Sequence, residues 1–358
     1  MTERRAITLA TFLGIIVLAL ILVVCRPFTW GRESEIAVTG TAVSGDSVSA
    51  GASDQVDSGG SNTAGDTAVD RTRTTITYKN ASGSSVTETF ELDLDSTVSG
   101  SAVVSGAVVN AEKGNILLTR FQVPEGYTRV PADEESLGTF LRTYPLKKAG
   151  AKVKLFDGSD KTNQSAHAAV FKFPLAGEEL QQCADSVMRV YAEYFWQTGQ
   201  YDRIAFHFVD GFLAEYSKWR KGKRIQVGMG ETAWIDGGKE DKSYEAFAKF
   251  MRIVYAYAST ISLKNESKSI SLKKIQIGDI FIKAGSPGHV VMVVDVCENA
   301  DGKKAFLLAQ GYTPAQQFHV LKNPAHEEDP WYYQEEIKYP LKTPEYTFEK
   351  GSLMHPEY

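Results

Sequence analysis

The chain has 358 residues and a net charge of −5, with 39 Lys and Arg against 44 Asp and Glu. This balance provides no basic footprint for nucleic acid, so we expect no nucleic-acid partner. The three cysteines, Cys25, Cys183 and Cys297, are too few for a disulfide framework, and the sequence leaves open whether Cys183 pairs with Cys297.

An apolar run near the start of the sequence, residues 6–25, is long enough to cross the ~30 Å hydrocarbon layer of a bilayer. Small residues are missing before Arg26, where a signal peptide would be cleaved, so the pattern favours an uncleaved helix with its N-terminus inside. A lipoprotein signal at Cys25 would need a small residue in place of Val24. We therefore expect a single-pass protein of the cell membrane whose folded domain lies outside the cytoplasm.

The stretch after this segment is poor in core-forming residues. Ser, Gly, Thr, Ala and Asp dominate it up to Asp70, and such a composition cannot bury enough apolar surface to offset the entropy of ordering. We expect a mostly disordered linker over residues 33–114. Within it, residues 74–78 and 86–94 alternate apolar and polar side chains, as strands do.

From about Asn115 the sequence carries the aromatic and apolar residues of a folded domain. Its periodicity predicts helices and strands in chain order. The expected helices are 136–143, 177–197 and 244–259. The expected strands are 116–121, 152–156, 167–173, 280–282, 289–296 and 304–310. Helices followed by a hairpin-rich sheet indicate an α+β fold. The chain then divides into an anchor at 1–32, the linker, a folded domain at 115–350 and a tail at 351–358.

The most informative stretch is GDIFIKAGSPGHVVMVVDV, residues 278–296. A short strand is followed by a loop of small residues that includes Ser286 and Gly288. His289 then stands at the start of a strand that is apolar on both faces and therefore central in its sheet. Small loop residues let a substrate backbone approach closely, and a histidine here reaches into that space. The alternative is a buried histidine with a structural role.

This arrangement resembles the papain-like cell-wall hydrolases of the NlpC/P60 group, in which a Gly-Asp pair and a following His-Val mark the catalytic histidine. Their order is a cysteine on a helix, a histidine on a strand and a polar residue on the next strand. Cys183, His289 and Gln310 match this order. The resemblance implies a papain-like fold and a cysteine amidase or peptidase acting on cell-wall peptide. Cys183 would be the nucleophile, His289 the general base and Gln310 the orienting group.

Strand pairing decides whether Gln310 faces His289. If residues 290–295 and 304–310 pair antiparallel around an even loop at 298–303, Gln310 lies nearly opposite Val291. It then shares a face with His289, because side chains alternate along a strand. An odd loop would place Gln310 on the other face.

Cys183 is open to two interpretations. A nucleophilic cysteine sits in the first turn of its helix, where the positive end of the dipole lowers the thiol pKa. The preceding GEELQQC predicts an earlier helix start, and Cys183 shares an apolar face with Leu180 and Val187, as a buried core cysteine would. Gln181 or Gln182 would supply an oxyanion donor in the first case.

Other polar residues are weaker candidates for binding. His167 opens another strand and either faces the same cleft or is structural. Asp185, Arg189 and Glu193 follow one another at i, i+4 spacing, which is typical of ion pairs and is also compatible with a polar cleft wall. The sequence has no HExxH, paired CxxC, P-loop or dinucleotide motif, so we expect neither a metal nor a cofactor.

Several long stretches resemble a further family. They are LFDGSDKTNQSAHAAVF, LQQCADSVMRVYAEY, GDIFIKAGSPGHVVMVVDV and FLLAQGYTPAQQFHVLKNP. On these motifs, residues 115–350 are identified as a member of the uncharacterised bacterial family called domain of unknown function 4846, which implies no activity. The alternative to an enzyme is a non-catalytic module that binds a glycan or peptide. Tyr312 and the aromatic residues 331–333 would line its groove, unless they belong to the core.

Overall fold

The computed structural model describes residues 73–79, 85–91, 109, 114–228 and 231–358. The predicted anchor at 6–25 lies outside these ranges, as does most of the predicted linker. Among the residues described, none of the helices is both long and apolar enough to cross a membrane.

Helices and strands are interspersed along the chain. The six described α-helices all lie before residue 266, and the long strands of the main sheet follow them. The helices are α3 (Leu117–Arg120), α4 (Leu137–Thr143), α5 (Cys183–Gln197), α6 (Tyr216–Arg220), α7 (Tyr244–Tyr257) and α8 (Thr260–Asn265). The strands are β1 (Arg73–Lys79), β2 (Ser85–Glu91), β3 (Tyr127–Arg129), β4 (His167–Val170), β5 (Ala205–His207), β6 (Leu213–Glu215), β7 (Lys223–Val227), β8 (Thr232–Asp236), β9 (Ser267–Ser269), β10 (Ile280–Lys283), β11 (His289–Asn299), β12 (Lys304–Gln310), β13 (His319–Leu321), β14 (Tyr332–Tyr333), β15 (Leu341–Lys342), β16 (Thr347–Phe348) and β17 (Leu353–Pro356).

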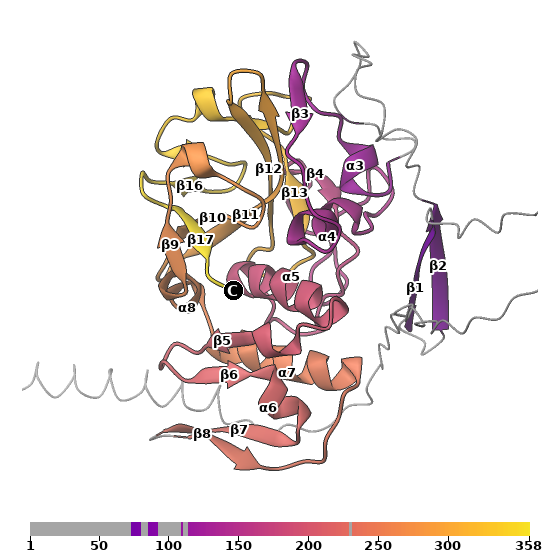
Figure 1. The fold of residues 1–358 in the computed structure, drawn as a ribbon, viewed down its shortest axis with the longest axis vertical. Coiled ribbons are helices and arrows are strands. Elements are labelled where there is room, and N and C mark those ends of the chain that lie inside the picture. Colours follow the sequence, from indigo (N-terminus) through magenta and orange to yellow (C-terminus); the bar gives the residue numbers. More distant parts are fainter. Residues whose placement is uncertain (1–72, 80–84, 92–108, 110–113, 229–230) are drawn as a thin grey trace, which may run out of the picture.

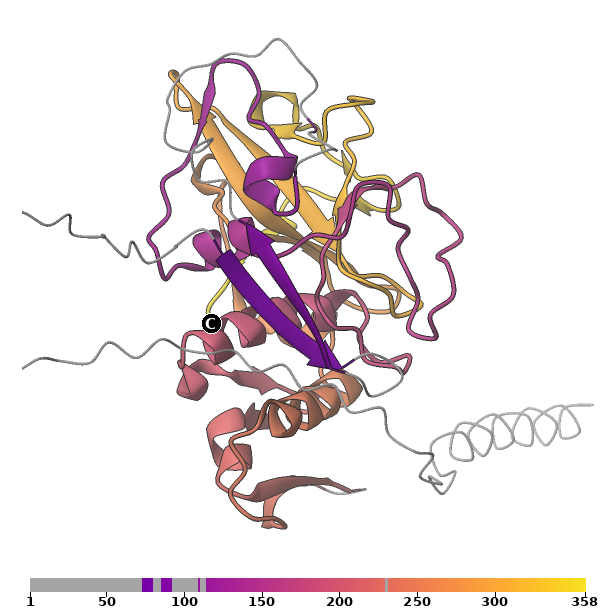
Figure 2. The ribbon, with the colours of Figure 1, turned by 90° about the vertical axis from the view of Figure 1, so that its right-hand side faces the viewer.

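A nine-stranded sheet organises the folded region. Its main path is β4-β13-β12-β11-β10-β17-β9, with β14 beside β12 and β3 beside β11, and its pairings are antiparallel. Figure 1 shows α5 below the sheet, with α6, α7 and the hairpins β5–β6 and β7–β8 further down. Figure 2 shows the long orange strands running down toward α5. Helices gathered at one end of an antiparallel sheet confirm the α+β class.

The long strand β11 is central and buried on both faces. Val290, Met292 and Val294 belong to the larger core, which also contains most of the apolar side of α5. Val291 and Val293 belong to a second core on the opposite face, beneath the segments around β14 to β16. Because successive side chains point to opposite faces, this burial explains the continuous apolar run predicted for a central strand.

The polar row on α5 is buried against α7. Arg189 pairs with Glu193 and donates hydrogen bonds to the hydroxyls of Tyr244 at 2.6 Å and Tyr255 at 3.2 Å. The predicted ion pair therefore exists for Arg189 and Glu193. Asp185 is not part of this ion-paired group and instead caps the helix.

Two predicted strands are wrong. Residues 116–121 contain the short helix α3, and the buried guanidinium of Arg120 donates to the carbonyls of Gly114 and Lys147. In the segment 152–156, both backbone groups of Val153 bond to the side-chain amide of Gln164 at 3.0 Å, and the next two residues form isolated bridges with Asp160 and Gln316 rather than a strand. An apolar run predicts burial in both places, but not which backbone conformation achieves it.

The residues expected to form a tail belong to the sheet. β17 pairs with β10 on one side and with β9 on the other. Leu353 and Met354 are buried in the two cores. The sequence pattern misses this strand because only two of its residues are large and apolar.

The strands predicted in the linker region are present. β1 and β2 pair antiparallel in a two-stranded sheet of their own, with Arg73 opposite Glu91 and Lys79 opposite Ser85. The alternation of apolar and polar residues thus identified both strands, and β2 ends earlier than predicted.

Candidate functional site

Cys183 is the first residue of α5, although the sequence predicts a start near residue 177. The side chain of Gln182 accepts a hydrogen bond from the backbone N–H of Asp185, whose carboxylate accepts one from the N–H of Gln182 at 3.0 Å. This reciprocal capping box sets the helix start at Cys183. The thiol therefore lies at the positive end of the helix dipole, and the prediction that the helix begins before it is wrong.

The thiol of Cys183 is nevertheless buried, with 7% of the residue exposed. Burial and the neighbouring Asp185 raise its pKa to about 11, although the backbone N–H groups of Ala184 and Val290 face the sulfur and oppose this shift. Cys297 is also free and buried. Within the described residues, no hydrogen bond joins Cys183 to His289. In this state the thiol combines a helix-terminal position with the environment of a core cysteine.

The hairpin between β11 and β12 has an odd loop. Glu298 pairs with Lys304, which leaves residues 299–303 between them. Such a loop alone would turn Gln310 away from the face of His289, because side chains alternate along each strand.

A β-bulge at Val294 reverses this effect. Asp295 pairs with Leu307, whereas Val293 pairs with Leu308, so one residue of β11 is left without a partner. The bulge changes the register by one position, and the two shifts cancel. The ends of the two strands recover the alignment that an even loop would have produced.

As a result, His289 and Gln310 share one face, and Nε2 of His289 lies 2.7 Å from Oε1 of Gln310. The imidazole is 2% exposed, and its ring centroid lies 4.6 Å from that of Tyr312, 4.8 Å from that of Tyr346 and 6.0 Å from that of Phe348. Burial lowers the pKa of His289 to about 4, against the opposing effect of the hydrogen bond with Gln310. The imidazole is therefore neutral at physiological pH.

Glu345 supports the other end of the Gln310 side chain. Nε2 of Gln310 donates to Oε2 of Glu345 at 2.8 Å, and the same oxygen accepts from the ammonium of Lys161. The second oxygen of Glu345 accepts from the amide of Asn163 at 3.1 Å. The hydroxyl of Tyr312 donates to the backbone carbonyl of Glu345 at 3.3 Å. The side chains of Lys161 and Glu345 are 6% and 11% exposed, so this ion pair is buried.

A second histidine lies on the other side of Gln310. β13 places His319 directly opposite Gln310 in the ladder. Nε2 of His319 lies 3.4 Å from the amide nitrogen of Gln310, and its Nδ1 lies 2.8 Å from the carbonyl oxygen of Gln317. Burial lowers the pKa of His319 to about 3.

Of the six predicted binding residues, Tyr312 belongs to this cluster and three more lie near it. The ring centroid of His167 is 6.1 Å from that of His319, and its Nε2 lies 3.0 Å from the carbonyl oxygen of Ala151. The side-chain oxygen of Gln182 accepts from the hydroxyl of Thr313 at 3.1 Å. Asp185 is buried, one of its oxygens lacks a partner among the described residues, and burial raises its pKa to about 8.

The other two lie in the loop between β10 and β11. Ser286 is exposed and its hydroxyl bonds to none of the described residues. Gly288 is closely surrounded, since a Cβ here would come within 2.6 Å of the Thr260 hydroxyl and 2.5 Å of the Gly285 carbonyl oxygen. The loop thus packs against the start of α8, and only glycine fits at this position.

Sequence patterns gave no signal for several members of the cluster. Glu345 comes from the turn between β15 and β16, and Lys161 and Asn163 come from an irregular loop, so no periodicity marks them. His319 lies in the stretch FLLAQGYTPAQQFHVLKNP, where no spacing distinguishes it from its neighbours. Trp331 and Tyr332 are core residues, with 0% and 2% exposed, and do not line a groove.

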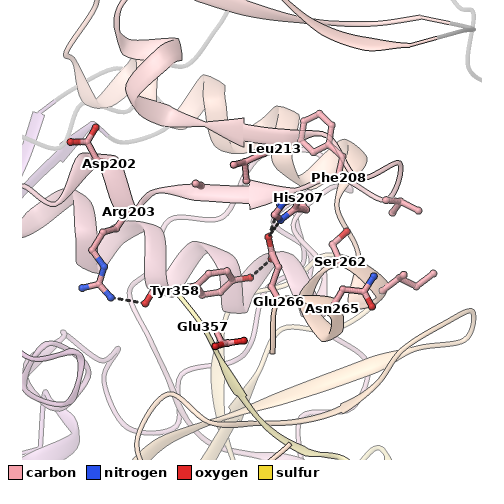
Figure 3. A pocket seen from close by; sticks show the side chains of 14 residues that line it. Asp202, Arg203, His207, Phe208, Leu213, Ser262, Asn265, Glu266, Glu357 and Tyr358 are labelled. Carbon is pink, nitrogen blue, oxygen red and sulfur yellow. Dashed lines mark hydrogen bonds and ion pairs between the residues drawn. The ribbon is translucent and has the colours of Figure 1, made fainter. Parts of the chain in front are cut away.

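A cavity of about 590 Å³ lies away from this cluster, between the β5–β6 hairpin, α8 and residues 357–358. Figure 3 shows Glu266 within it, bonded to both His207 and Tyr358. Its walls also include the buried hydroxyl of Ser262, which has no partner among the described residues, and apolar groups such as Leu213. None of the residues predicted from the sequence lines this cavity.

The described residues contain no group of three or more His, Cys, Asp or Glu side chains placed to hold a metal ion. A family model with the description "Domain of unknown function (4846)" matches residues 117–355. No curated protein and no solved structure matches the chain.

Proposed function

Because this chain belongs to the family of the domain of unknown function 4846, whose description assigns no activity, we propose a function from the site itself. The chain acts as a papain-like cysteine hydrolase that cleaves an amide bond. Cys183 is the nucleophile, His289 the general base and Gln310 the residue that orients the imidazole.

The hydrogen bond of 2.7 Å between His289 and Gln310 carries this proposal. It places a polar orienting group on Nε2 and leaves Nδ1 without a partner among the described residues. Cys183 stands at the start of α5, and its sulfur faces the backbone N–H of Val290, the residue after His289. A thiol at a helix start, a base on a neighbouring strand and a third group behind the base are the parts of a nucleophilic triad.

The proposed reaction uses these parts in two steps. His289 takes the thiol proton on Nδ1 while the sulfur of Cys183 attacks the amide carbon. The amine then leaves with this proton, and a thioester remains. Water attacks the thioester carbon while His289 accepts a proton from it. The C–S bond then breaks, the acid leaves, and the imidazolium returns its proton to the sulfur of Cys183. The backbone N–H groups of Cys183 and Ala184 at the start of α5 can stabilise the oxyanion, as helix N-termini do.

The described state is closed, because both Cys183 and His289 are buried and are not hydrogen bonded to each other. Catalytic hydrogen bonds often form only in the complex with substrate. The proposal therefore requires substrate binding to expose the thiol and to bring the two groups together.

The expected location suggests the substrate. If residues 6–25 anchor the chain in the membrane with the folded domain outside, the nearest abundant amides are those of cell-wall peptides. We include this anchor and this substrate class, the stem peptide of peptidoglycan, in the proposal.

The full chain should release new amino groups from purified peptidoglycan fragments, measured by mass spectrometry of the products. Cys183→Ala should lower the rate by roughly 10³-fold or more, since loss of a nucleophile removes the covalent route. Cys297→Ala is the matched control and should leave the rate unchanged, because Cys297 lies outside the cluster. An undiminished rate in Cys183→Ala would contradict the assignment.

The alternative function, a non-catalytic binding module, has one observation in its favour. The cavity at Glu266 is large enough for a small ligand and lies apart from the cysteine and histidine. Binding of a cell-wall fragment with unchanged affinity by the double variant Cys183→Ala/His289→Ala, without turnover by the parent chain, would favour this second function.

A further inference from the structure

We propose that Glu345 is a positioning residue. It holds the side-chain amide of Gln310 in one orientation and thereby keeps the proton of the neutral His289 imidazole on Nε2. The inference deepens the proposed function and rests on it for one consequence, that the free Nδ1 is the atom that accepts the thiol proton.

The groups around Gln310 determine which end of its amide faces which neighbour. The carboxylate of Glu345 offers only acceptor oxygens, and one of them lies 2.8 Å from the end of Gln310 that points away from His289. That end must therefore be the NH₂ group. The ammonium of Lys161 shares the same carboxylate oxygen and keeps it in place.

The contacts of His319 independently indicate the same orientation of the Gln310 amide. Its Nδ1 lies 2.8 Å from the carbonyl oxygen of Gln317, which is an acceptor, so Nδ1 carries the proton of this neutral ring. Its Nε2 is consequently an acceptor and lies 3.4 Å from the same end of the Gln310 amide. Both hydrogens of one NH₂ group thus have acceptors.

The carbonyl oxygen of Gln310 is then the atom at 2.7 Å from His289. An oxygen without a hydrogen can only accept, so Nε2 of His289 must donate, and the single proton of the neutral ring is located there. Nδ1 keeps its lone pair. If the amide turned over, its NH₂ group would face Nε2 and the proton would move to Nδ1, the wrong place for a base.

Glu345 is the group that prevents this 180° rotation of the amide. A glutamine side chain has three free torsions, and the contact of Gln310 with His319 is long. The carboxylate of Glu345 is held by Lys161 and Asn163, which lie in a loop about 180 residues earlier in the sequence. The orientation of the amide is therefore set by a buried ion pair that touches neither the thiol nor the imidazole.

The test is an NMR measurement of the protonation of His289 in the full chain, labelled with ¹⁵N-histidine. Two-bond ¹H–¹⁵N correlations distinguish an Nε2–H ring from an Nδ1–H ring, and the His289→Gln spectrum assigns the signal. The wild-type chain near pH 7 should show His289 as Nε2–H. Finding Nδ1–H in the wild type would overturn the proposal without any further variant.

Two changes at Glu345 then test its role. Glu345→Gln keeps a carbonyl oxygen for Gln310 and Lys161, so the Nε2–H signal should remain. The double variant Lys161→Met/Glu345→Leu removes the carboxylate without leaving the ammonium unpaired, and it should lose the pure Nε2–H pattern. Glu349→Ala, an exposed acid on the same segment, is the control and should change nothing. A wild-type pattern in the folded double variant would overturn the role of Glu345.

Hydrolysis measured in parallel separates this proposal from the proposed function. The double variant should lose at most about 10²- to 10⁴-fold in kcat/KM, the usual contribution of a general base. If the double variant has a shifted proton pattern and Cys183→Ala hydrolyses at the wild-type rate, the positioning role is supported and the hydrolase is rejected. If the double variant keeps the wild-type pattern and hydrolysis is lost in Cys183→Ala, the hydrolase is supported and the positioning role is rejected.

Discussion

At the scale of the residue, Cys183 is subject to two opposing influences. Its place at the start of α5 and the N–H groups that face its sulfur favour the thiolate. Burial and the neighbouring Asp185 favour the thiol, and they prevail, because the pKa of Cys183 rises to about 11. His289 is likewise neutral, since burial lowers its pKa to about 4. The described state therefore contains no thiolate–imidazolium pair of these two residues.

This balance predicts slow alkylation of Cys183 in the native chain. At pH 7, a thiol with a pKa near 11 has roughly 10²-fold less thiolate than one with the ordinary pKa of ~8.5, and burial slows its reaction further. In a Cys25→Ser/Cys297→Ala background, labelling by iodoacetamide should be at least that much slower than in urea. The native rate should still increase above pH 9. Rapid native labelling with an apparent pKa below 8.5 would contradict the described state.

At the scale of the element, the site depends on the contact between the end of β12 and the first turn of α5. Gly311 follows Gln310 and lies against this turn. A Cβ on Gly311 would come within 2.1 Å of the Ser186 hydroxyl and 2.9 Å of the Gln182 carbonyl oxygen. The hydroxyl of Ser186 already donates to that carbonyl at 2.7 Å, so neither atom is free to move aside. The absence of a side chain at residue 311 lets strand and helix approach.

Gly311→Ala should therefore destabilise the fold by about 1–3 kcal/mol, the usual cost of forcing extra volume into a packed contact. The matched control is Gly177→Ala, where an added Cβ would meet no atom within 4 Å. That change should be neutral or slightly stabilising, because alanine restricts the unfolded chain. Urea unfolding of both variants measures the difference, and equal stabilities would show that the contact is not tight.

Some of the helices and strands were predictable from the sequence and others were not. The spacing of apolar residues and the composition predict the central strands β10, β11 and β12 and the helices α4 and α7, because each of these elements buries a regular pattern of apolar side chains. The resemblance to the papain-like hydrolases selects His289 and Gln310 as a candidate pair on these strands. The start of α5 depends on a capping box at Gln182, and the alignment of the pair depends on the bulge at Val294. Neither feature has a periodic signal, so neither was predictable.

At the scale of the whole molecule, the cluster is assembled from distant parts of the chain. Three adjacent strands supply His289, Gln310 and His319, and two loops supply Lys161 and Glu345. The sheet thus buries two uncharged histidines, one on each side of Gln310, within one hydrogen-bonded group. Such groups link the stability of the entire fold to pH.

The direction of this linkage follows from the pKa values. Burial lowers the pKa of His289 to about 4 and that of His319 to about 3, whereas an unfolded chain has a value of ~6.5. The unfolded state therefore binds more protons below pH 6.5, and the stabilisation that is complete above this pH is lost as the pH falls toward 4 and 3. These shifts correspond to up to roughly 3 kcal/mol for His289 and roughly 5 kcal/mol for His319. Asp185 acts in the opposite direction, because burial raises its pKa to about 8.

His319→Gln isolates one of these contributions, because glutamine can still accept from Gln310 and donate to Gln317 but does not titrate. The free energy of unfolding in urea, measured at pH 7 and pH 4.5, should fall less in this variant than in the wild type. The difference should be about 2.5 kcal/mol, because pH 4.5 lies two units below the pKa of an unfolded histidine and each unit corresponds to ~1.4 kcal/mol. Equal losses in the wild type and His319→Gln would mean that His319 is not held neutral by the fold, and the acceptor role of its Nε2 would then fail as well.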